Sequence, residues 1–521
     1  MNSTKPLITI CLTGLVLLLA SSTTHSATPP NIVFILADDL GYGDVQCLNP
    51  ASKIVTPNID RLAATGMIFT DAHSPSSVCT PTRYGVLTGR YNWRSRLKNG
   101  VLGGFSRRLI EPHRMTVGTL LQGRGYHTAC LGKWHLGMDW PLRNGDAADD
   151  HGNYGTGYAD AWRVDYAAPI QNGPNSLGFD YFLGISASLD MPPYVFIENN
   201  RATEIPTVEK KWIRQGPAGR SFEAIDVLPR ITDKAVEYIG QRAPASKAGN
   251  PFFLYFPLNA PHTPILPAPE WRGKSGLSDY GDFVMQVDAT VGRVLEALEL
   301  NGIRQNTMVI FTSDNGCSPA ANIAEMQRKD HFPSYHFRGH KADIYEGGHR
   351  VPFIVGWPAR VAPGTTSDQL ICLTDLMATC AELADAALPE NAAEDSVSIL
   401  PALSGTATAP LHEAVVHHSI NGSFSIRQKD WKLVLCPGSG GWSAPRPGSD
   451  QAKSLSLIQL FDLANDIGET NNVQDRHPDI VEQLTRLLEK YVAEGRSTPG
   501  SSQVNNGAVN LWRAGRPEKR P

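Results

Sequence analysis

Asn31-Ile-Val-Phe-Ile-Leu-Ala37 is a short, uninterrupted apolar run near the start of the chain. A run of this length and composition predicts a strand that is buried on both faces, as in a parallel sheet. It leads directly into Asp38-Asp39-Leu40-Gly41-Tyr42-Gly43-Asp44, so acidic side chains follow its carboxyl end. The stretch therefore predicts a buried strand with polar residues at its tip.

Three later apolar runs have the same arrangement. Residues 307–312 lead into Asp314 and Asn315, residues 126–131 into Lys133 and His135, and residues 252–256 into Asn259 and His262. Helical patterns lie between the runs, over 116–125, 230–242 and 282–302. This alternation predicts an α/β fold, with a large, mostly parallel sheet flanked by helices on both faces. Ligands bind beyond the carboxyl ends of such strands, so the polar residues predict one shared site.

The acidic residues predict a metal ion at this site. If Asp38, Asp39 and Asp314 converge, each close pair of charges costs about 4 kcal/mol at an effective dielectric constant near 20. A divalent cation would remove this repulsion. Carboxylates together with the Asn315 amide favour Ca²⁺, with Mg²⁺ as the smaller alternative. A single Asp-Asp pair after a strand is more often a turn or a cap, so the hypothesis requires all four residues to meet.

A second notable stretch is Ser76-Ser77-Val78-Cys79-Thr80-Pro81-Thr82-Arg83. Pro81 suits the first turn of a helix, and Thr80 or Thr82 is expected to cap its free backbone donors. Cys79 would then lie at the positive end of the helix dipole, with Arg83 projecting to the same side one turn later. The pattern favours a nucleophile. The alternative is a buried or disulfide-bonded cysteine beside a capped helix.

Cys79-Thr-Pro-Thr-Arg83, followed by a run ending in Thr88-Gly89-Arg90, resembles the signature of the type I sulfatases, in the alkaline phosphatase superfamily. The resemblance implies that a formylglycine-generating or sulfatase-maturating enzyme oxidises Cys79 to formylglycine (3-oxoalanine). It also implies that the hydrated aldehyde attacks the sulfur of a sulfate ester. The implied fold is alkaline-phosphatase-like, with a smaller C-terminal domain of an antiparallel sheet and a helix.

The resemblance assigns roles to further residues in this sequence. The implied metal is one Ca²⁺ per chain, with Asp38, Asp39, Cys79, Asp314 and Asn315 as its ligands. The implied catalytic residues are Cys79, Arg83, Lys133, His135, His262 and Lys341, with both lysines on the sulfate and His262 at the leaving oxygen. Matches are weaker for His113, His336, His340, Asp343 and His349, which are expected to contact the sugar. Residues 186–199 resemble a segment of bacterial sulfatases that act on sulfated glycans, so the expected substrate is a sulfated saccharide.

The chain divides into three predicted parts. Residues 1–27 have the basic end, short apolar core and small-residue region of a signal peptide, which predicts a periplasmic or secreted protein without a membrane span. Residues 28–405 are the predicted catalytic domain and 406–521 the smaller C-terminal domain with a polar tail. That domain has predicted strands at 414–419, 423–427, 431–435 and 458–462, and a helix at 478–493. Residues 438–453, rich in Gly, Ser and Pro, predict a loop at the cleft mouth.

Composition gives weaker constraints. The 521 residues carry a formal net charge of −4, which does not favour nucleic-acid binding. Besides Cys11 and Cys79 there are six cysteines, whose pairing cannot be read from their spacing. Two other functions fit the motifs in part: a phosphodiesterase or phosphonate monoester hydrolase of the same superfamily, and a non-catalytic relative that binds sulfated glycans.

Overall fold

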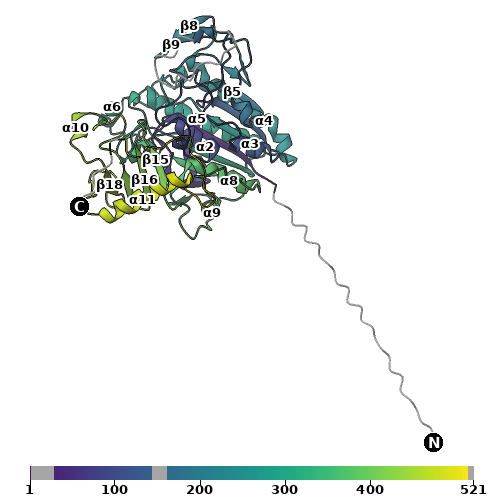
Figure 1. Cartoon of the computed structure of the whole chain (residues 1–521). Coiled ribbons are helices and arrows are strands. Elements are labelled where there is room, and N and C mark those ends of the chain that lie inside the picture. Colours follow the sequence, from purple (N-terminus) through teal and green to yellow (C-terminus); the bar gives the residue numbers. More distant parts are fainter. Residues whose placement is uncertain (2–27, 144–160, 514, 516–521) are drawn as a thin grey trace.

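The computed structural model describes residues 28–143 and 161–513, together with Met1 and Gly515. The predicted signal peptide lies almost wholly outside the described residues. A ten-stranded sheet with the order β13-β2-β12-β11-β1-β10-β4-β5-β6-β7 forms the centre of the larger domain (Figure 1). Among the helices of the described ranges, none combines the length and the apolar character that crossing a membrane requires.

The four strands predicted from apolar runs are neighbours at the centre of this sheet. They are β11 (Thr307–Ser313), β1 (Asn31–Ala37), β10 (Phe252–Pro257) and β4 (His127–Lys133), and they run parallel with β5 (Tyr181–Ile185) beyond them. Every residue of β1 is buried, as expected for a strand between two helical layers. Ala37 pairs with Ser313 in register, so the polar residues after β1 and β11 meet at one edge.

The outer strands make the sheet mixed rather than wholly parallel. On one side are β12 (Phe353–Gly356), β2 (Met67–Phe69) and β13 (Thr365–Ser367), of which β12 is antiparallel to β11. On the other side are β6 (Ile197–Glu198) and β7 (Arg201–Ala202), both in antiparallel pairings. The parallel prediction therefore holds for the centre, which carries the site.

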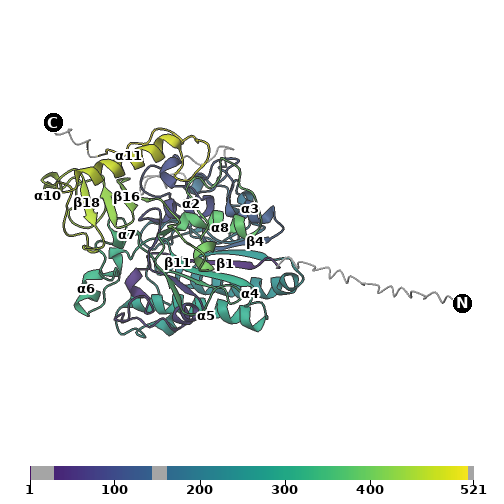
Figure 2. The ribbon, with the colours of Figure 1, turned by 90° about the horizontal axis from the view of Figure 1, so that it is seen from below.

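Helices cover both faces of the sheet, and Figure 2 shows the two layers. The helices α1 (Pro57–Ala64), α4 (Val227–Lys247) and α5 (Asp279–Leu300) pack on one face. The helices α2 (Cys79–Thr88), α3 (Val117–Gln122) and α8 (Leu376–Leu383) pack on the other. In α5, Val284, Val287, Val291 and Val294 are buried at the three- and four-residue spacing of an amphipathic helix.

The C-terminal residues form a separate antiparallel sheet, as predicted. Its strands are β15 (Val415–His418), β16 (Phe424–Gln428), β17 (Trp431–Val434) and β18 (Gln459–Asp462), covered by α11 (Pro478–Glu494). Gly422 has a φ of 80° in the turn between β15 and β16, a conformation that favours glycine. Tyr91 and Trp93 of the larger domain belong to the core of this sheet, so the two domains share packing.

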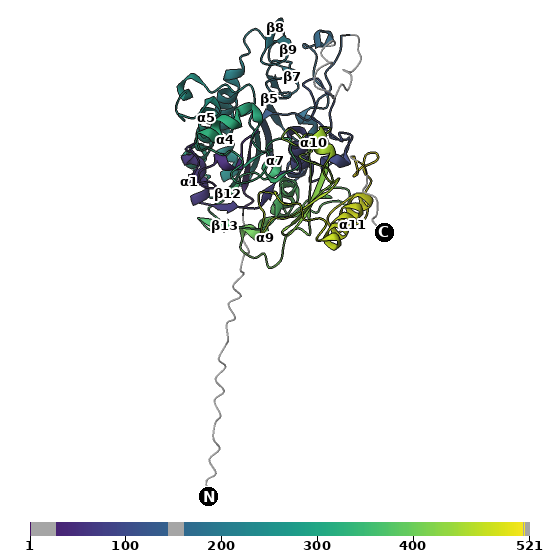
Figure 3. The same cartoon turned by 90° about the vertical axis from the view of Figure 1, so that its left-hand side faces the viewer.

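Short elements complete the fold. They are the paired strands β3 (Ala72–His73) and β14 (Ile371–Cys372), the hairpin of β8 (Val208–Lys211) and β9 (Gln215–Ala218), and the helices α6 (Ile323–Arg328), α7 (Glu346–His349), α9 (Leu400–Leu403) and α10 (Asp450–Lys453). Figure 3 shows the β8–β9 hairpin at the top, far from α9 and α11. Within the described ranges, all seven cysteines are free.

Candidate active site

The tips of β1 and β11 bring four predicted metal ligands together. The backbone N–H of Asp39 donates to Asp314 Oδ1 at 3.2 Å, and Asn315 Nδ2 donates to Asp39 Oδ1 at 2.7 Å. Asp38, Asp39, Asp314 and Asn315 are all at most 1% exposed. The convergence predicted from parallel strands is therefore present.

Cys79 is the first residue of α2 and lies beside these carboxylates. Its Sγ is 3.6 Å from Asp38 Oδ1 and 3.7 Å from Lys341 Nζ. The predicted caps are wrong, because Thr80 accepts from the Leu102 N–H and Thr82 donates to the Ser76 carbonyl. No side chain in the described ranges caps α2. The two threonines instead tie the start of the helix to its flanking loops.

Three cations lie among the three carboxylates. Arg83 donates through Nη2 to Asp314 Oδ2 at 2.9 Å and through Nη1 to the Lys133 carbonyl at 2.9 Å. Lys133 Nζ is 2.6 Å from Asp38 Oδ2, and Lys341 Nζ is 2.7 Å from Asp39 Oδ2. The cluster is therefore balanced in formal charge by its own side chains. Repulsion between carboxylates, on which the metal prediction relied, is not by itself an argument for an ion here.

The arrangement of ligand atoms nevertheless fits a hard divalent cation. Atoms of Asp38, Asp39, Cys79 and His262 lie within 4.8 Å of one another. Asn315 uses its amide nitrogen as a donor, while its buried Oδ1 has no hydrogen-bond partner among the described residues. Converging carboxylates with an unpaired amide oxygen match the ligands that Ca²⁺ and Mg²⁺ prefer.

Burial and the neighbouring charges shift the pKa values of the groups in this cluster in opposite directions. Burial and the charge of Asp38 raise the pKa of Asp314 to about 7. Burial would also raise the pKa of Asp38, but Lys133 and its other cationic neighbours hold it well below the usual value. Burial raises the pKa of the Cys79 thiol far above its usual value, despite the two lysines. This shift disfavours the thiolate form, which is the nucleophilic form of an unmodified cysteine.

The two predicted histidines present different atoms. His135 Nε2 donates to the Leu102 carbonyl at 2.8 Å, which leaves Nδ1 unprotonated; that atom has no partner in the described part of the chain. Burial, with Lys133 and Arg83, lowers the pKa of His135 well below its usual value. His262 Nδ1 donates to the Thr263 carbonyl at 2.7 Å, and its Nε2 lies 3.5 Å from Asp39. Burial lowers the pKa of His262 as well.

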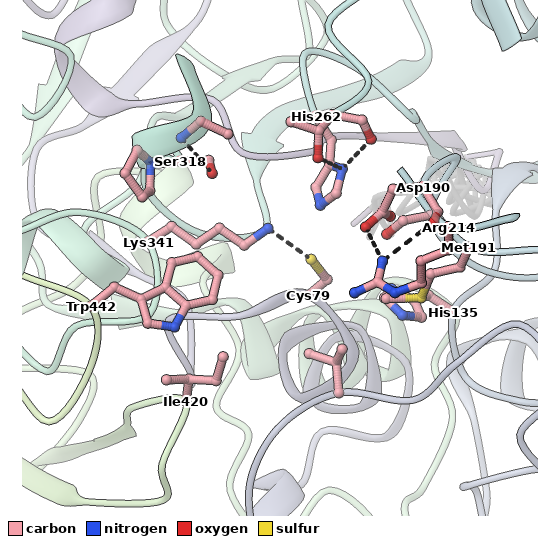
Figure 4. A pocket seen from close by; sticks show the side chains of 15 residues that line it. Cys79, His135, Asp190, Met191, Arg214, His262, Ser318, Lys341, Ile420 and Trp442 are labelled. Carbon is pink, nitrogen blue, oxygen red and sulfur yellow. Dashed lines mark hydrogen bonds and ion pairs between the residues drawn. The ribbon is translucent and has the colours of Figure 1, made fainter. Parts of the chain in front are cut away.

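These residues open into a cavity of about 480 Å³ (Figure 4). The side chains that line it are Cys79, Val101, His135, Ser188, Asp190, Met191, Arg214, His262, Thr263, Ser318, Pro319, Ala320, Lys341, Ile420 and Trp442. Ser188, Asp190 and Met191 of the segment 186–199 contribute, and so does Trp442 of the predicted loop 438–453. The loop prediction is wrong for residues 450–453, which form α10. Sequence reasoning missed Arg214, which lies in the β8–β9 turn and has no motif around it. A tryptophan within a Gly-, Ser- and Pro-rich loop was a usable sign for Trp442.

None of the five residues with weaker sugar-contact predictions lines this cavity. His113 and His336 are exposed and do not line the cavity. His349 is fully buried between the domains, so a sugar in the cavity cannot reach it, and this prediction is corrected. His340 Nδ1 lies 3.5 Å from Asp343 Oδ2. Asp343 is also fully buried, and its Oδ1 accepts from the backbone N–H groups of residues 442 and 443, so it positions the Trp442 loop instead of touching substrate.

Comparisons with known proteins agree with this geometry. The chain matches the Sulfatase family over residues 30–386, and N-sulphoglucosamine sulphohydrolase, C-terminal, over residues 336–439. It is 34% identical to the N-acetylgalactosamine-6-O-sulfatase of Bacteroides thetaiotaomicron, covering 89% of this chain and 93% of the relative. It is 34% identical to human arylsulfatase A, covering 92% and 91%. A solved structure from work on glycosaminoglycan metabolism by Bacteroides thetaiotaomicron superposes with a TM-score of 0.77 and 32% identity, covering 89% and 99%.

Proposed function

This chain belongs to the sulfatase family, and from that premise we propose that it removes O-sulfate from a sulfated carbohydrate, using formylglycine at position 79 and a bound Ca²⁺. As a sulfatase it is an enzyme that hydrolyses sulfate esters: water and R–O–SO₃⁻ give the alcohol, sulfate and a proton. The relatives named for a substrate include enzymes that act on N-acetylgalactosamine 6-sulfate, which supports a sulfated sugar.

One observation carries the proposal: Cys79 Sγ lies in the cavity wall, 3.6 Å from Asp38 Oδ1 and 3.7 Å from Lys341 Nζ, where the acidic and cationic side chains converge. Burial also raises the pKa of the Cys79 thiol, which disfavours the thiolate that an unmodified cysteine would need for attack. Formylglycine in its place supplies a hydrated aldehyde whose oxygen attacks the ester sulfur. Because Cys79 is only 2% exposed, the maturating enzyme must reach it before the chain folds.

The proposed metal ligands are the oxygens of Asp38, Asp39, Asp314 and Asn315, together with the modified residue 79. A bound Ca²⁺ supplies positive charge beside the reacting group. In this structure Lys133 and Lys341 donate to Asp38 and Asp39. When those carboxylates serve as metal ligands, both ammonium groups become available to the sulfate oxygens, which need fixed positive partners.

The remaining side chains handle protons and orientation. Arg83 is held by Asp314 and the Lys133 carbonyl, so its charge is fixed beside position 79. His135 presents an unprotonated Nδ1 and is suited to accept a proton from the hydroxyl at position 79. His262 is oriented by the Thr263 carbonyl, which accepts its Nδ1 proton, so it can give a proton to the departing alcohol only after its Nε2 has been protonated. Lys341, which also lines the cavity, is a second proton donor.

The proposal also places the enzyme outside the cytoplasm, in the periplasm or secreted. The reason is the signal-peptide pattern at 1–27, which lies almost entirely outside the described residues. A fractionation experiment with an antibody against the mature chain tests this assignment.

Two measurements test the chemistry. Mass spectrometry of the peptide spanning 76–90 from active enzyme should show formylglycine at position 79, and plain cysteine in fully active protein would refute the mechanism. Sulfate release from a panel of defined sulfated saccharides should exceed hydrolysis of an aryl phosphodiester. The reverse preference would favour a phosphodiesterase, while tight saccharide binding without sulfate release would favour a glycan-binding protein.

A further inference from the structure

The cavity has two chemically different walls above the reacting group. Val101, Ile420 and Trp442 form an apolar wall, and the Trp442 side chain remains 36% exposed. Ser188, Asp190 and Arg214 belong to the lining as well, and Figure 4 shows Trp442 and Arg214 on opposite sides of Cys79. A ligand in this space therefore meets the Trp442 ring on one side, near Lys341, and the Asp190–Arg214 pair on the other, near Met191.

The polar wall has hydrogen-bonding capacity that the protein does not use. Ser188 Oγ and Asp190 Oδ1 are buried and have no hydrogen-bond partner among the residues that the structure describes. A buried polar atom left unpaired destabilises the folded protein, because it has lost its hydrogen bonds to water. Such a cost beside a cavity is recovered when a ligand supplies the missing partner, so these two atoms point to a polar ligand.

Arg214 fixes the orientation of Asp190. Its Nη1 pairs with Asp190 Oδ2 and also donates to the Asp190 backbone carbonyl at 3.3 Å. The Asp190 side chain is 10% exposed and that of Arg214 is 22% exposed, so the pair is largely shielded from water. Asp190 is therefore a hydrogen-bond acceptor whose orientation is set by Arg214. Arg214 is a positioning residue, which affects the ligand through Asp190.

Charge decides what kind of group this acceptor can bind. A carboxylate accepts hydrogen bonds from a hydroxyl or an amide N–H, but repels a second sulfate or a uronic carboxylate. The repulsion is strong at contact distance in a partly buried cavity, although Arg214 offsets part of it. The apolar wall suits the C–H face of a pyranose ring, because aromatic side chains give apolar contact area.

We infer that Asp190, positioned by Arg214, together with Ser188 and Trp442, is the subsite that selects the sugar. The sulfated unit lies against Trp442 and turns a hydroxyl or an acetamido N–H toward Asp190. The selected substrate class is a monosulfated neutral sugar, and not a uronic acid or a sugar with a second sulfate at that edge. This inference rests on the proposed sulfatase function.

The test compares a sugar ester with an ester that has no sugar. For Asp190→Asn, kcat/KM on N-acetylgalactosamine 6-sulfate should fall about 10- to 100-fold, because the acceptor loses its charge and its ion pair with Arg214. The same variant should stay within about twofold of wild type on 4-nitrophenyl sulfate, which cannot reach the polar wall. Relative turnover of a disulfated N-acetylgalactosamine should rise, because the repelling charge is gone. Trp442→Ala should lose about tenfold on the sugar ester alone.

Asp233→Asn is the matched control. Asp233 also pairs with an arginine, Arg293, but its side chain is 68% exposed and lies outside the cavity. This variant should leave both substrates unchanged. Equal losses on sugar and aryl esters in Asp190→Asn would mean that Asp190 serves the sulfate site, and no loss on the sugar would mean that it recognises nothing. Either result overturns the inference.

A binding measurement keeps this inference separate from the proposed chemistry. Calorimetric titration of N-acetylgalactosamine 6-sulfate into Cys79→Ala and into Cys79→Ala with Asp190→Asn should show weaker binding in the double variant. If wild-type enzyme releases no sulfate from any ester, the proposed function fails, whereas the titration still reports on the subsite. Identical affinities in the two variants would overturn the subsite with the sulfatase activity intact.

Discussion

Two buried clusters of ionisable side chains in this molecule have the same formal charge and different surroundings. The catalytic cluster pairs Asp38, Asp39 and Asp314 with Arg83, Lys133 and Lys341. The interdomain cluster pairs Asp71, Glu346 and Glu469 with Arg350, Arg427 and Lys432, around the histidines 73, 349 and 417. A short segment joins them, since Ser74 bonds to His349 and His417, while Cys79 belongs to the catalytic cluster.

The side chains of the interdomain cluster pair mainly with one another. Lys432 Nζ contacts Glu346 at 3.0 Å, Glu469 at 2.8 Å and His349 Nε2 at 3.0 Å, and His349 Nδ1 lies 3.0 Å from His73 Nδ1. None of these residues lines the cavity at the active site. Because Lys432 belongs to β17 and Glu346 to α7, these contacts hold the C-terminal sheet against the larger domain.

The comparison of the two clusters shows that charge balance and burial do not identify a catalytic site. What distinguishes the catalytic cluster is access to a cavity. Buried polar atoms without a partner among the described residues occur in both clusters, as Asn315 Oδ1 and His417 Nε2 show. His349 was assigned to the sugar because it follows Lys341 within a motif. Its position shows that neighbours in sequence can belong to different clusters.

The largest expected effect separates the clusters by activity. Cys79→Ala should lose at least about 10³-fold in kcat, because the reacting group itself is removed, while the protein stays folded. Cys380→Ala is the control, since Cys380 is also fully buried but lies in α8, away from the cavity. Sulfate release per folded molecule should be unchanged in the control. Comparable activity in both variants would remove Cys79 from the mechanism.

Metal content gives the next contrast. Wild-type enzyme should contain one Ca²⁺ per chain by elemental analysis, and a chelator should abolish activity and lower the melting temperature, since an ion that binds only the folded state stabilises it. Asp314→Asn should lose the ion. His417→Phe should keep it, although the three histidines 73, 349 and 417 are also close enough to bind a metal. Loss of metal in His417→Phe alone would place the ion in the interdomain cluster.

A smaller effect is expected on stability in the interdomain cluster. Lys432→Met leaves Glu346 and Glu469 buried without their shared cation, which should cost about 3–5 kcal/mol in the free energy of unfolding. kcat per folded molecule should remain near wild type, as Lys432 does not reach the cavity. Lys453→Met should change neither quantity, because Lys453 is 67% exposed. Lost kcat at unchanged stability would mean that the clusters are coupled.

The smallest effect concerns pH. Burial lowers the pKa values of His73, His349 and His417 below the usual value near 6.5, so these rings stay neutral in the folded state and gain protons on unfolding. Their contribution to stability is therefore complete above about pH 6.5 and declines as the pH falls. His417→Phe keeps the ring stacked on His349 and removes one titrating group. Below pH 6, denaturation curves should show a slope about 1.4 kcal/mol per pH unit shallower than in wild type. An identical slope would contradict burial of a neutral His417.

The sequence determined the elements and the main members of the catalytic cluster. The apolar runs at 31–37, 307–313 and 252–257 form central strands, because a fully apolar run leaves little alternative to burial on both faces. Parallel pairing then places Asp38 and Asp314 at one edge, so their meeting follows from strand ends alone. The helix after Cys79 and the hairpin at Gly422 likewise follow from local backbone preferences.

Only the tertiary structure decided which side chains pair and which face the cavity. Lys133 and Lys341 neutralise the carboxylates that sequence reasoning treated as repelling, and Arg214 reaches Asp190 from a hairpin without any motif. His349 is enclosed by β15 and β17 of the other domain. The physical reason is the separation along the chain over which each effect acts. Backbone preference and apolar periodicity act over a few neighbouring residues. Ion pairing, access to water and unmet hydrogen bonds depend on loops and domains that are distant in the chain.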